Sequence, residues 1–350
     1  MPAKEMRTAR ARANSRLRGL LRLTNAFVSE DATVHREFVS AMHKLIRPPT
    51  DWFSLRDIAT LAVREALQGT ESVPFDLFIG QVTLQTICSG LLQSLPMPSI
   101  DRRGHFRAAA RGITRLCLAS KAAAATHLDT TASRILHHDL RELLPDATRF
   151  PNPIDYILPP YETMWRVVAT LIAYTYHDLD YRQVLYGLYE QPTSEQFIDH
   201  KIYLNKSRVS AQDMVRETLR VHPPTKRIGR VMPDSSWIRH ILGLTHDVLH
   251  RADVEAAQRK ASVWGEAPGI WRPERFIKGK GGAHSSAQLL AFGYGPGACI
   301  AREWAPMAIG VIAGAILYAL EELGMEYSIV RGPRVGDREG WEGWEVKKVA

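Results

Sequence analysis

Cysteine is scarce in this chain of 350 residues: three are present, Cys88, Cys117 and Cys299, at no regular spacing. Disulfide frameworks and zinc sites use clustered cysteines, so this spacing argues against both. Long apolar runs are also missing, because the longest, Met307 to Leu320, is shorter than the roughly 20 residues that span a bilayer. The sequence therefore predicts an intracellular protein in a reducing compartment, with no transmembrane segment.

Acidic residues are nearly absent from the first 22 positions, which contain seven basic residues and one acidic residue, Glu5. The whole chain carries a formal charge of +8. Three interpretations of the basic start stay open: an organelle-targeting helix, an arm that contacts phosphate or lipid, or the solvated face of an ordinary helix. No base-reading motif or interleaved aromatic residues accompany the charge, so we expect no nucleic-acid partner, whereas peripheral membrane contact stays open.

Common hydrolase and nucleotidase motifs are missing as well. The chain has no G-x-S-x-G, no H-E-x-x-H and no phosphate-binding loop, since "KGKGGAH" lacks the G-K-[ST] ending. No change in composition marks a linker. We therefore expect one domain over residues 1–350, with a helical part over 1–150 and a possible basic N-terminal arm.

Helical periodicity dominates the first two hundred residues, as in Val34, Phe38, Met42 and Leu45. Helices are predicted near 53–68, 75–94, 104–120 and 125–144, followed by a buried helix from about residue 160 and another capped by the Ser-x-x-Asp box at 210–213. The pieces "RIGRVM" and "DVLHRADVEA" favour strands, a long helix is expected over 300–323, and residues 324–350 favour a hairpin. The predicted class is mainly α with small β-sheets (α+β).

The stretch "AFGYGPGACI", residues 291–300, combines several turn-forming residues with one cysteine. Gly293, Gly295 and Ala298 match the dinucleotide fingerprint G-x-G-x-x-A, but only about fifty residues follow the loop, too few for the remaining strands of that fold. A buried free cysteine beside a glycine turn is a second interpretation. In a third, Cys299 is a metal-binding thiolate at the start of the following helix, stabilised by the helix dipole and backbone N–H groups.

Two upstream motifs favour the third interpretation. Glu217 and Arg220 form an E-x-x-R pair that would share one helix face, and "WRPERF" at 271–276 brings a second arginine, Arg275. With Phe292, Gly295 and Cys299, and in this order, the motifs resemble the cytochromes P450, the haem-thiolate monooxygenases, and indicate an N-terminally shortened, eukaryotic-type member. The resemblance covers about residues 160–323 as a haem-binding core. It implies a P450-like fold whose N-terminal anchor and first elements are missing.

The same resemblance assigns further roles. Glu162 and Thr163, in "PPYETM", resemble the acid and alcohol of the family's oxygen-activating helix, although two prolines, Pro159 and Pro160, replace its Ala-Gly. Gly297 stands where the family usually has a propionate-binding Arg or His. The resemblance therefore points to Arg230, with residue 227 in reserve, as the contact to a haem propionate.

The implied activity follows from these residues. Cys299 would be the axial thiolate of haem b, and the protein would hydroxylate or epoxidise a small lipophilic substrate with O2 and electrons from an NADPH-dependent reductase, in specialised metabolism. Residues 225–235 and the hairpin near 328–345, with Trp341 and Trp344, would line part of the pocket. The expected location is cytoplasmic or peripheral to the endoplasmic reticulum. The alternatives are a haem-thiolate enzyme that isomerises, dehydrates or cyclises without a reductase, and a non-catalytic haem-binding remnant.

Overall fold

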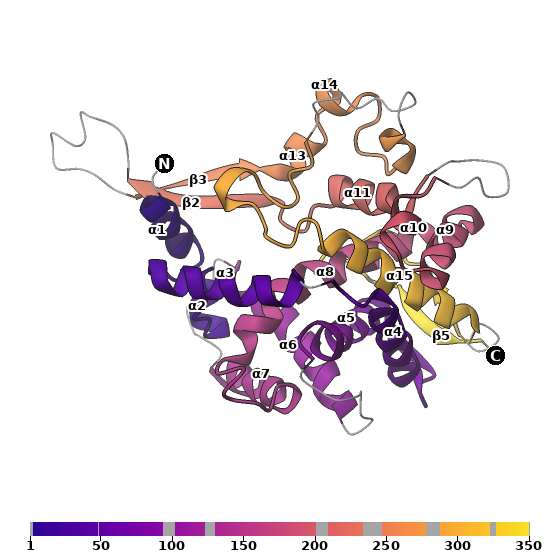
Figure 1. The fold of residues 1–350 in the computed structure, drawn as a ribbon, viewed down its shortest axis with the longest axis horizontal. Helices are drawn as coiled ribbons and strands as arrows, with labels where there is room; N and C mark the ends of the chain where they lie inside the picture. The colour runs from indigo at the N-terminus through magenta and orange to yellow at the C-terminus, as the bar shows by residue number, and fades with distance from the viewer. Residues whose placement is uncertain are drawn as a thin grey trace.

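The computed structural model describes residues 3–47, 49–93, 102–122, 130–200, 209–233, 247–277, 288–322 and 327–349. Over this part of the chain the fold is mostly helical, with two small antiparallel sheets (Figure 1). The mainly α class predicted from the sequence is thus confirmed. No helix in the described ranges combines the length and apolar character needed to cross a bilayer.

The first part of the chain forms a succession of helices. Asp31 and Asp51 accept hydrogen bonds from backbone N–H groups at the starts of two of them, as N-caps do. The predicted helices are present, although residues 125–129 of the last one lie outside the described residues. The helices are α1 (Ala3–Ala13), α2 (Ser15–Leu21), α3 (Ala32–Ile46), α4 (Trp52–Leu67), α5 (Phe75–Thr86) with the π-turn η1 (Ile87–Leu91), α6 (Arg103–Ala119) and α7 (Thr130–Leu143).

The central helix α8 (Pro153–Thr175) begins seven residues before the expected Pro160, so Pro159 and Pro160 lie inside it. A proline removes one helical hydrogen bond, and Pro159 deprives the carbonyl of Asp155 of its usual partner. The side-chain amide of Asn25 replaces that partner, with Nδ2 at 3.2 Å from the Asp155 oxygen. The Asp155 carboxylate also accepts from the N–H of Thr24 at 2.9 Å. Contacts from the N-terminal segment therefore compensate the helix for a missing N–H.

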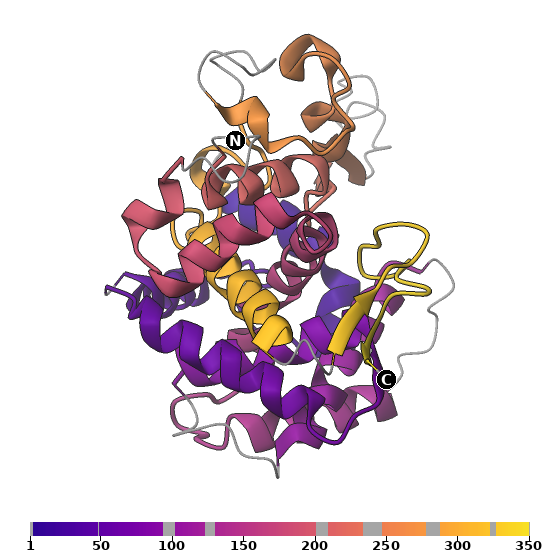
Figure 2. The same cartoon turned by 90° about the vertical axis from the view of Figure 1, so that its right-hand side faces the viewer.

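The second half of the helical core comprises α9 (Leu179–Glu190), α10 (Ser194–Ile198), α11 (Ala211–Val221) and α15 (Ala305–Glu322). The predicted Ser210–Asp213 capping box is present at the start of α11. Helix α15 packs against α4, α8, α9 and α11, and Figure 2 shows it, in gold, passing through the middle of the helical layers. One hydrophobic cluster, from Leu20 to Val346, includes residues of all these packed helices.

The two sheets join segments far apart in the chain. β4 (Tyr327–Val330) and β5 (Glu345–Lys348) form the predicted C-terminal hairpin, and β1 (Ser72–Pro74) adds a third strand in the order β1-β5-β4. The sequence pattern around this "SVP" segment indicates a breaker between helices and does not predict the strand. β2 (Arg227–Pro233) pairs with β3 (Asp247–Asp253), and α1 lies against β2 (Figure 1).

The stretch "DVLHRADVEA" is only partly a strand. Its second part, α13 (Val254–Gln258), is helical because Asp253 caps it by accepting from the N–H of Ala256. The helix α14 (Ala261–Trp264) and the 3-10 turns η3 (Pro273–Phe276) and η4 (Gly295–Gly297) follow.

Candidate functional site

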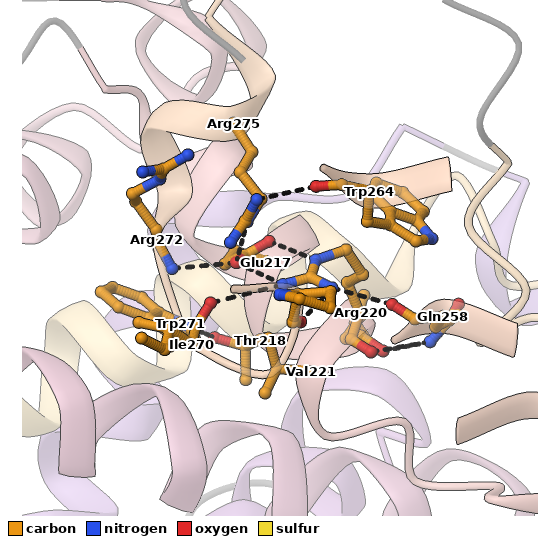
Figure 3. Close-up of polar contacts among 12 residues, drawn as sticks. Glu217, Thr218, Arg220, Val221, Gln258, Trp264, Ile270, Trp271, Arg272 and Arg275 are labelled. Carbon is orange, nitrogen blue, oxygen red and sulfur yellow. Dashed lines mark hydrogen bonds and ion pairs between the residues drawn. The ribbon is translucent and has the colours of Figure 1, made fainter. Parts of the chain in front are cut away.

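Glu217 and Arg220 form a bidentate ion pair on α11. The Nε atom of Arg220 lies 2.7 Å from one carboxylate oxygen of Glu217, and Nη2 lies 2.8 Å from the other. Both side chains are fully buried. Figure 3 shows the pair at the centre of a polar network, with the Arg220 guanidinium also bonded to the carbonyls of Gln258 and Ile270. Fork-to-fork geometry of this kind fixes both partners.

Arg275 joins this pair from η3, as the sequence predicted. Its Nε lies 3.3 Å from Glu217, and its Nη1 donates to the carbonyl of Trp264 at 2.8 Å (Figure 3). Its Nη2 donates to the carbonyl of Ala267 at 2.7 Å. The backbone N–H of Arg272 donates to the same Glu217 oxygen at 2.9 Å. Burial lowers the pKa of Arg275, while the Glu217 carboxylate opposes that shift. One carboxylate thus ties helix α11 to two later segments.

Gln258 connects this network to the cysteine loop, and no sequence motif indicates this role. The side chain is fully buried, and its Nε2 donates to the carbonyls of Leu219 and Arg220 at 3.0 Å each. Its Oε1 accepts from the backbone N–H of Leu290 at 2.6 Å. Leu290 directly precedes the cysteine loop, residues 291–300. Gln258 therefore links the C-terminal end of α11 to the start of that loop by hydrogen bonds.

The cysteine loop closes on itself. The N–H of Cys299 donates to the carbonyl of Phe292 at 2.7 Å, and Phe292 packs against the main hydrophobic cluster. Gly293 and Gly295 have φ values of +76° and +65°, in the left-handed region that favours glycine. Gly293 and Gly295 thus stand where the closed backbone of the loop turns through left-handed conformations.

Cys299 is exposed, whereas Cys88 and Cys117 are buried. Desolvation near the sulfur raises the pKa of the Cys299 thiol, and a hydrogen bond from the backbone of Ala301 acts in the opposite direction. The interpretation as a buried free cysteine is therefore wrong.

The expected helix directly after Cys299 is absent, because residues 300–304 form turns and α15 begins at Ala305. Trp304 anchors these turns, since its Nε1 donates to Thr50 at 2.9 Å and its ring stacks on Trp52. The helix dipole therefore contributes less at the sulfur than predicted, because its effect is confined to the first turn.

Glu162 lies beside two arginines. Arg166, one turn further along α8, donates to one oxygen at 2.8 Å, and Arg338 from the C-terminal loop donates to the other. Arg166 also bonds Asp337 at 2.8 Å and the carbonyl of Pro224 at 2.8 Å. We call Glu162, Arg166, Asp337 and Arg338 the second ion cluster. Thr163, next to Glu162 in the chain, is half-buried.

Arg230 is half-buried on β2, where its Nη1 donates to the carbonyl of Gly229 at 2.7 Å. Burial lowers the pKa of Arg230. Burial also lowers the pKa of Arg10 on α1, and the repulsion from Arg230 and Arg7 adds to the shift. Two desolvated guanidinium groups near one another favour an anion between them. The sequence indicates Arg10 only as part of the basic start, and its nearness to β2 has no sequence signal.

Comparison with known proteins agrees with these features. The sequence model described as Cytochrome P450 matches residues 209–322. Cytochrome P450 714A2 from Arabidopsis thaliana is 26% identical over 105 residues, which are 30% of this chain and 20% of that protein. Ganoderic acid synthetase CYP5150L8 from Ganoderma lucidum is 27% identical over 172 residues, 39% of this chain and 31% of that protein. The matched part thus spans less than a third of these curated relatives.

Solved structures extend the likeness to almost the whole chain. The retinoic acid-bound cyanobacterial CYP120A1 has a TM-score of 0.66 at 16% identity, covering 99% of this chain and 86% of that one. A 6-coordinated cytochrome P450 from Thermus thermophilus has a TM-score of 0.58 at 15% identity, covering 98% and 88%. The fold is therefore that of the haem-thiolate proteins. The sequence of residues 209–322 is thus similar to the cytochrome P450 superfamily, and the fold is that of its solved members.

The donor set of this chain fits the haem of that superfamily. Among the described residues no group of three or more His, Cys, Asp or Glu side chains could hold a metal ion. A porphyrin supplies four nitrogen ligands of its own and takes an axial ligand from the protein, a role that one thiolate such as Cys299 can fill. The exposed sulfur, the closed glycine loop and the N–H of Ala301 suit a thiolate ligand. Arg10 and Arg230 are cations suited to propionates.

Proposed function

We propose that this protein binds haem b through the thiolate of Cys299 and oxidises a small lipophilic substrate with O2. Electrons would come from an NADPH-dependent reductase. The single observation that carries the proposal is the path from the Glu217 cluster through Gln258 to Leu290, because it fixes the loop that presents an exposed Cys299. When bound, haem supplies the oxidative chemistry.

The chain's own residues would have three tasks. Cys299 binds the iron, and the Ala301 N–H moderates the electron density on its sulfur. Arg230, with Arg10 from α1, neutralises the propionates. The Thr163 hydroxyl, on α8, orients the water that delivers protons. The predicted proton relay through Glu162 stays a prediction, and it would require an ion pair with Arg166 or Arg338 to open.

The substrate class rests on the relatives. One is named a ganoderic acid synthetase and one structural neighbour binds retinoic acid, which supports a small organic molecule of specialised metabolism. We further propose hydroxylation or epoxidation as the reaction, and a location in the cytoplasm or at the endoplasmic reticulum surface.

The occupied carboxylate of Glu162 favours a second candidate function. With both oxygens bound to arginines, and with Pro159 and Pro160 in the helix, α8 would suit a haem-thiolate enzyme that isomerises, dehydrates or cyclises its substrate without a reductase.

The test uses the haem-loaded protein, reduced and treated with carbon monoxide. We expect the Soret band of thiolate-ligated haem for the wild type and its loss in Cys299→Ser, whereas Cys117→Ser, in the interior of α6, retains it. A thiolate Soret band that persists in Cys299→Ser would overturn the proposal. NADPH-dependent turnover with a reductase then distinguishes the oxygenase from the second candidate, which converts its substrate without NADPH.

A further inference from the structure

The cysteine loop is held from two sides, of which the Glu217 network supplies one. On that side Gln258 accepts from the N–H of Leu290, ahead of the loop, at 2.6 Å. On the other side of Cys299, residues 300–304 form turns that precede the regular helix α15. The position of such turns relative to the sulfur depends on what they pack against.

Ala301, within these turns, carries the N–H that reaches the sulfur. Its backbone N–H donates to Cys299, and its carbonyl accepts from the N–H groups of Trp304 at 3.1 Å and of Ala305 at 2.8 Å. A hydrogen bond to a thiolate draws electron density from the sulfur, so the place of this N–H sets how strongly the sulfur donates to a metal. Contacts that fix the turns therefore also adjust Cys299.

Trp304 is the residue of these turns that enters the protein core. It is 7% exposed and belongs to the main hydrophobic cluster. Arg302 and Glu303, by contrast, are exposed and pair with each other at 3.1 Å, while Ile300 and Ala301 are half-buried. One indole thus joins the turns to the interior of the protein.

Thr50 and Trp52, next to the start of α4, hold this indole, and we call them the indole socket. The Nε1 of Trp304 donates to the hydroxyl of Thr50 at 2.9 Å, across 254 positions of the chain. Its ring stacks on Trp52, with the centroids 6.0 Å apart and the planes inclined by 27°. An indole nitrogen can only donate, so a buried one requires an acceptor at a defined place. The Thr50 hydroxyl thus fixes how the indole lies.

The indole socket is itself part of a fixed element. Asp51, between its two members, accepts from the N–H of Ser54 at 3.0 Å and caps α4. Helix α4 packs against α15, the helix that follows the turns. The turns after Cys299 are therefore held by two helices that also contact each other.

We propose that Trp304 is a positioning residue, which holds the Ala301 N–H against the Cys299 sulfur through its hydrogen bond to Thr50. The indole socket thereby limits how much electron density the thiolate gives to a bound iron. The inference deepens the function proposed above and rests on it where iron is concerned, whereas the hydrogen bond to the sulfur belongs to the chain without haem. Loss of that hydrogen bond leaves the sulfur a stronger donor and the iron harder to reduce.

The first test measures hydrogen exchange at the Ala301 amide in the full chain without haem. Trp304→Phe removes the indole N–H and Thr50→Val removes its acceptor, so each should accelerate this exchange about 3- to 10-fold, the effect of one ordinary hydrogen bond. The double variant should exchange no faster than either single one, because both changes remove the same bond. Thr50→Ser, which keeps the hydroxyl, should exchange at the wild-type rate.

Trp341→Phe is the matched control. The Nε1 of Trp341 also donates to an oxygen, the carbonyl of Asp337 at 2.8 Å, and the residue is 5% exposed, but it lies on the C-terminal loop. Its loss should lower stability about as much as Trp304→Phe does and leave the Ala301 exchange unchanged. Equal acceleration in Trp341→Phe would show a general loss of stability and overturn the proposal. Wild-type exchange in Trp304→Phe, or additive effects of Trp304→Phe and Thr50→Val, would overturn it as well.

The second test uses haem-loaded protein and needs no turnover. We expect a more negative reduction potential of the iron in Trp304→Phe and in Thr50→Val, and the wild-type potential in Thr50→Ser. An unchanged potential in Trp304→Phe would overturn the proposal. A chain that shows the exchange pattern but binds no haem through Cys299 would support the positioning of the Ala301 N–H and contradict the function proposed above.

Discussion

Arg338 donates a hydrogen bond to Glu162 across 176 positions of the chain, joining the C-terminal loop to the middle of helix α8. Arg166 completes the carboxylate's coordination from the same helix. Because Arg166 and Glu162 are almost fully buried, this cluster resembles the Glu217 network in kind. A residue expected to move protons thus also holds two segments together.

Glu162→Gln should therefore lower stability. Removing the charge leaves Arg338 without the Glu162 carboxylate and Arg166 with Asp337 as its remaining acid, and breaking a buried pair costs about 3–5 kcal/mol. Thermal or urea unfolding measures the loss. Glu303→Gln, at a pair whose glutamate side chain is 88% exposed, should change stability by less than about 0.5 kcal/mol. Unchanged stability combined with a large loss of turnover would instead favour the proton-relay role.

Gln258→Leu should loosen the cysteine loop. The change leaves the N–H of Leu290 and two α11 carbonyls without their partner, at a cost of about 1–3 kcal/mol. Hydrogen exchange at the Leu290 amide should accelerate, and haem-loaded protein should lose part of its thiolate Soret band. The exposed Gln191, at the end of α9, provides the matched control as Gln191→Leu. If the Leu290 amide exchanges at the wild-type rate, Gln258 does not position the loop.

The free energy of unfolding should decrease at acidic pH because of His222. Burial lowers the pKa of its imidazole to about 4, and Arg259 and Lys226 add to the shift. The unfolded chain binds the proton near pH 6.5, so stability is complete above that pH and is lost as the pH falls toward 4, by about 3 kcal/mol. Unfolding of the wild type and His222→Asn between pH 7 and pH 4 measures this slope. A variant with the same slope as the wild type would assign the effect to other groups.

Asn25 and Pro159 should show coupled effects. Asn25→Ala leaves the carbonyl of Asp155 unsatisfied, whereas Pro159→Ala supplies a helical N–H to that same carbonyl. In a double-mutant cycle we expect Asn25→Ala to cost about 1–3 kcal/mol alone and distinctly less in the Pro159→Ala background. Strict additivity of the two changes would refute the compensation.

The sequence predicted those parts of the fold that local rules determine. The Ser210 capping box and the Glu217–Arg220 pair follow from spacing along the chain, and each is present. Their order then led to the family. The elements around these motifs were predicted to within a few residues.

The features of the fold and of the site that the sequence did not predict depend on contacts between distant segments. The N–H that Pro159 lacks is replaced by an amide from residue 25, so the helix begins earlier than a rule about proline in the first turn allows. The role of Gln258 and the nearness of Arg10 to Arg230 also arise only when separate elements pack. A three-residue strand such as β1 has too little pattern to be recognised before its partner is known.

The unequal exposure of the three cysteines gives the folded chain one chemically addressable thiol. Burial raises the pKa of Cys117 to about 12 and raises that of Cys88 as well, so both resist alkylation until the chain unfolds. A maleimide added to the native protein should modify one cysteine per chain, Cys299, and iron bound to that sulfur would prevent the reaction. Maleimide labelling of the native protein thus measures the fraction of chains without haem. Under denaturing conditions, labelling of Cys88 and Cys117 measures the fraction of chains that have unfolded.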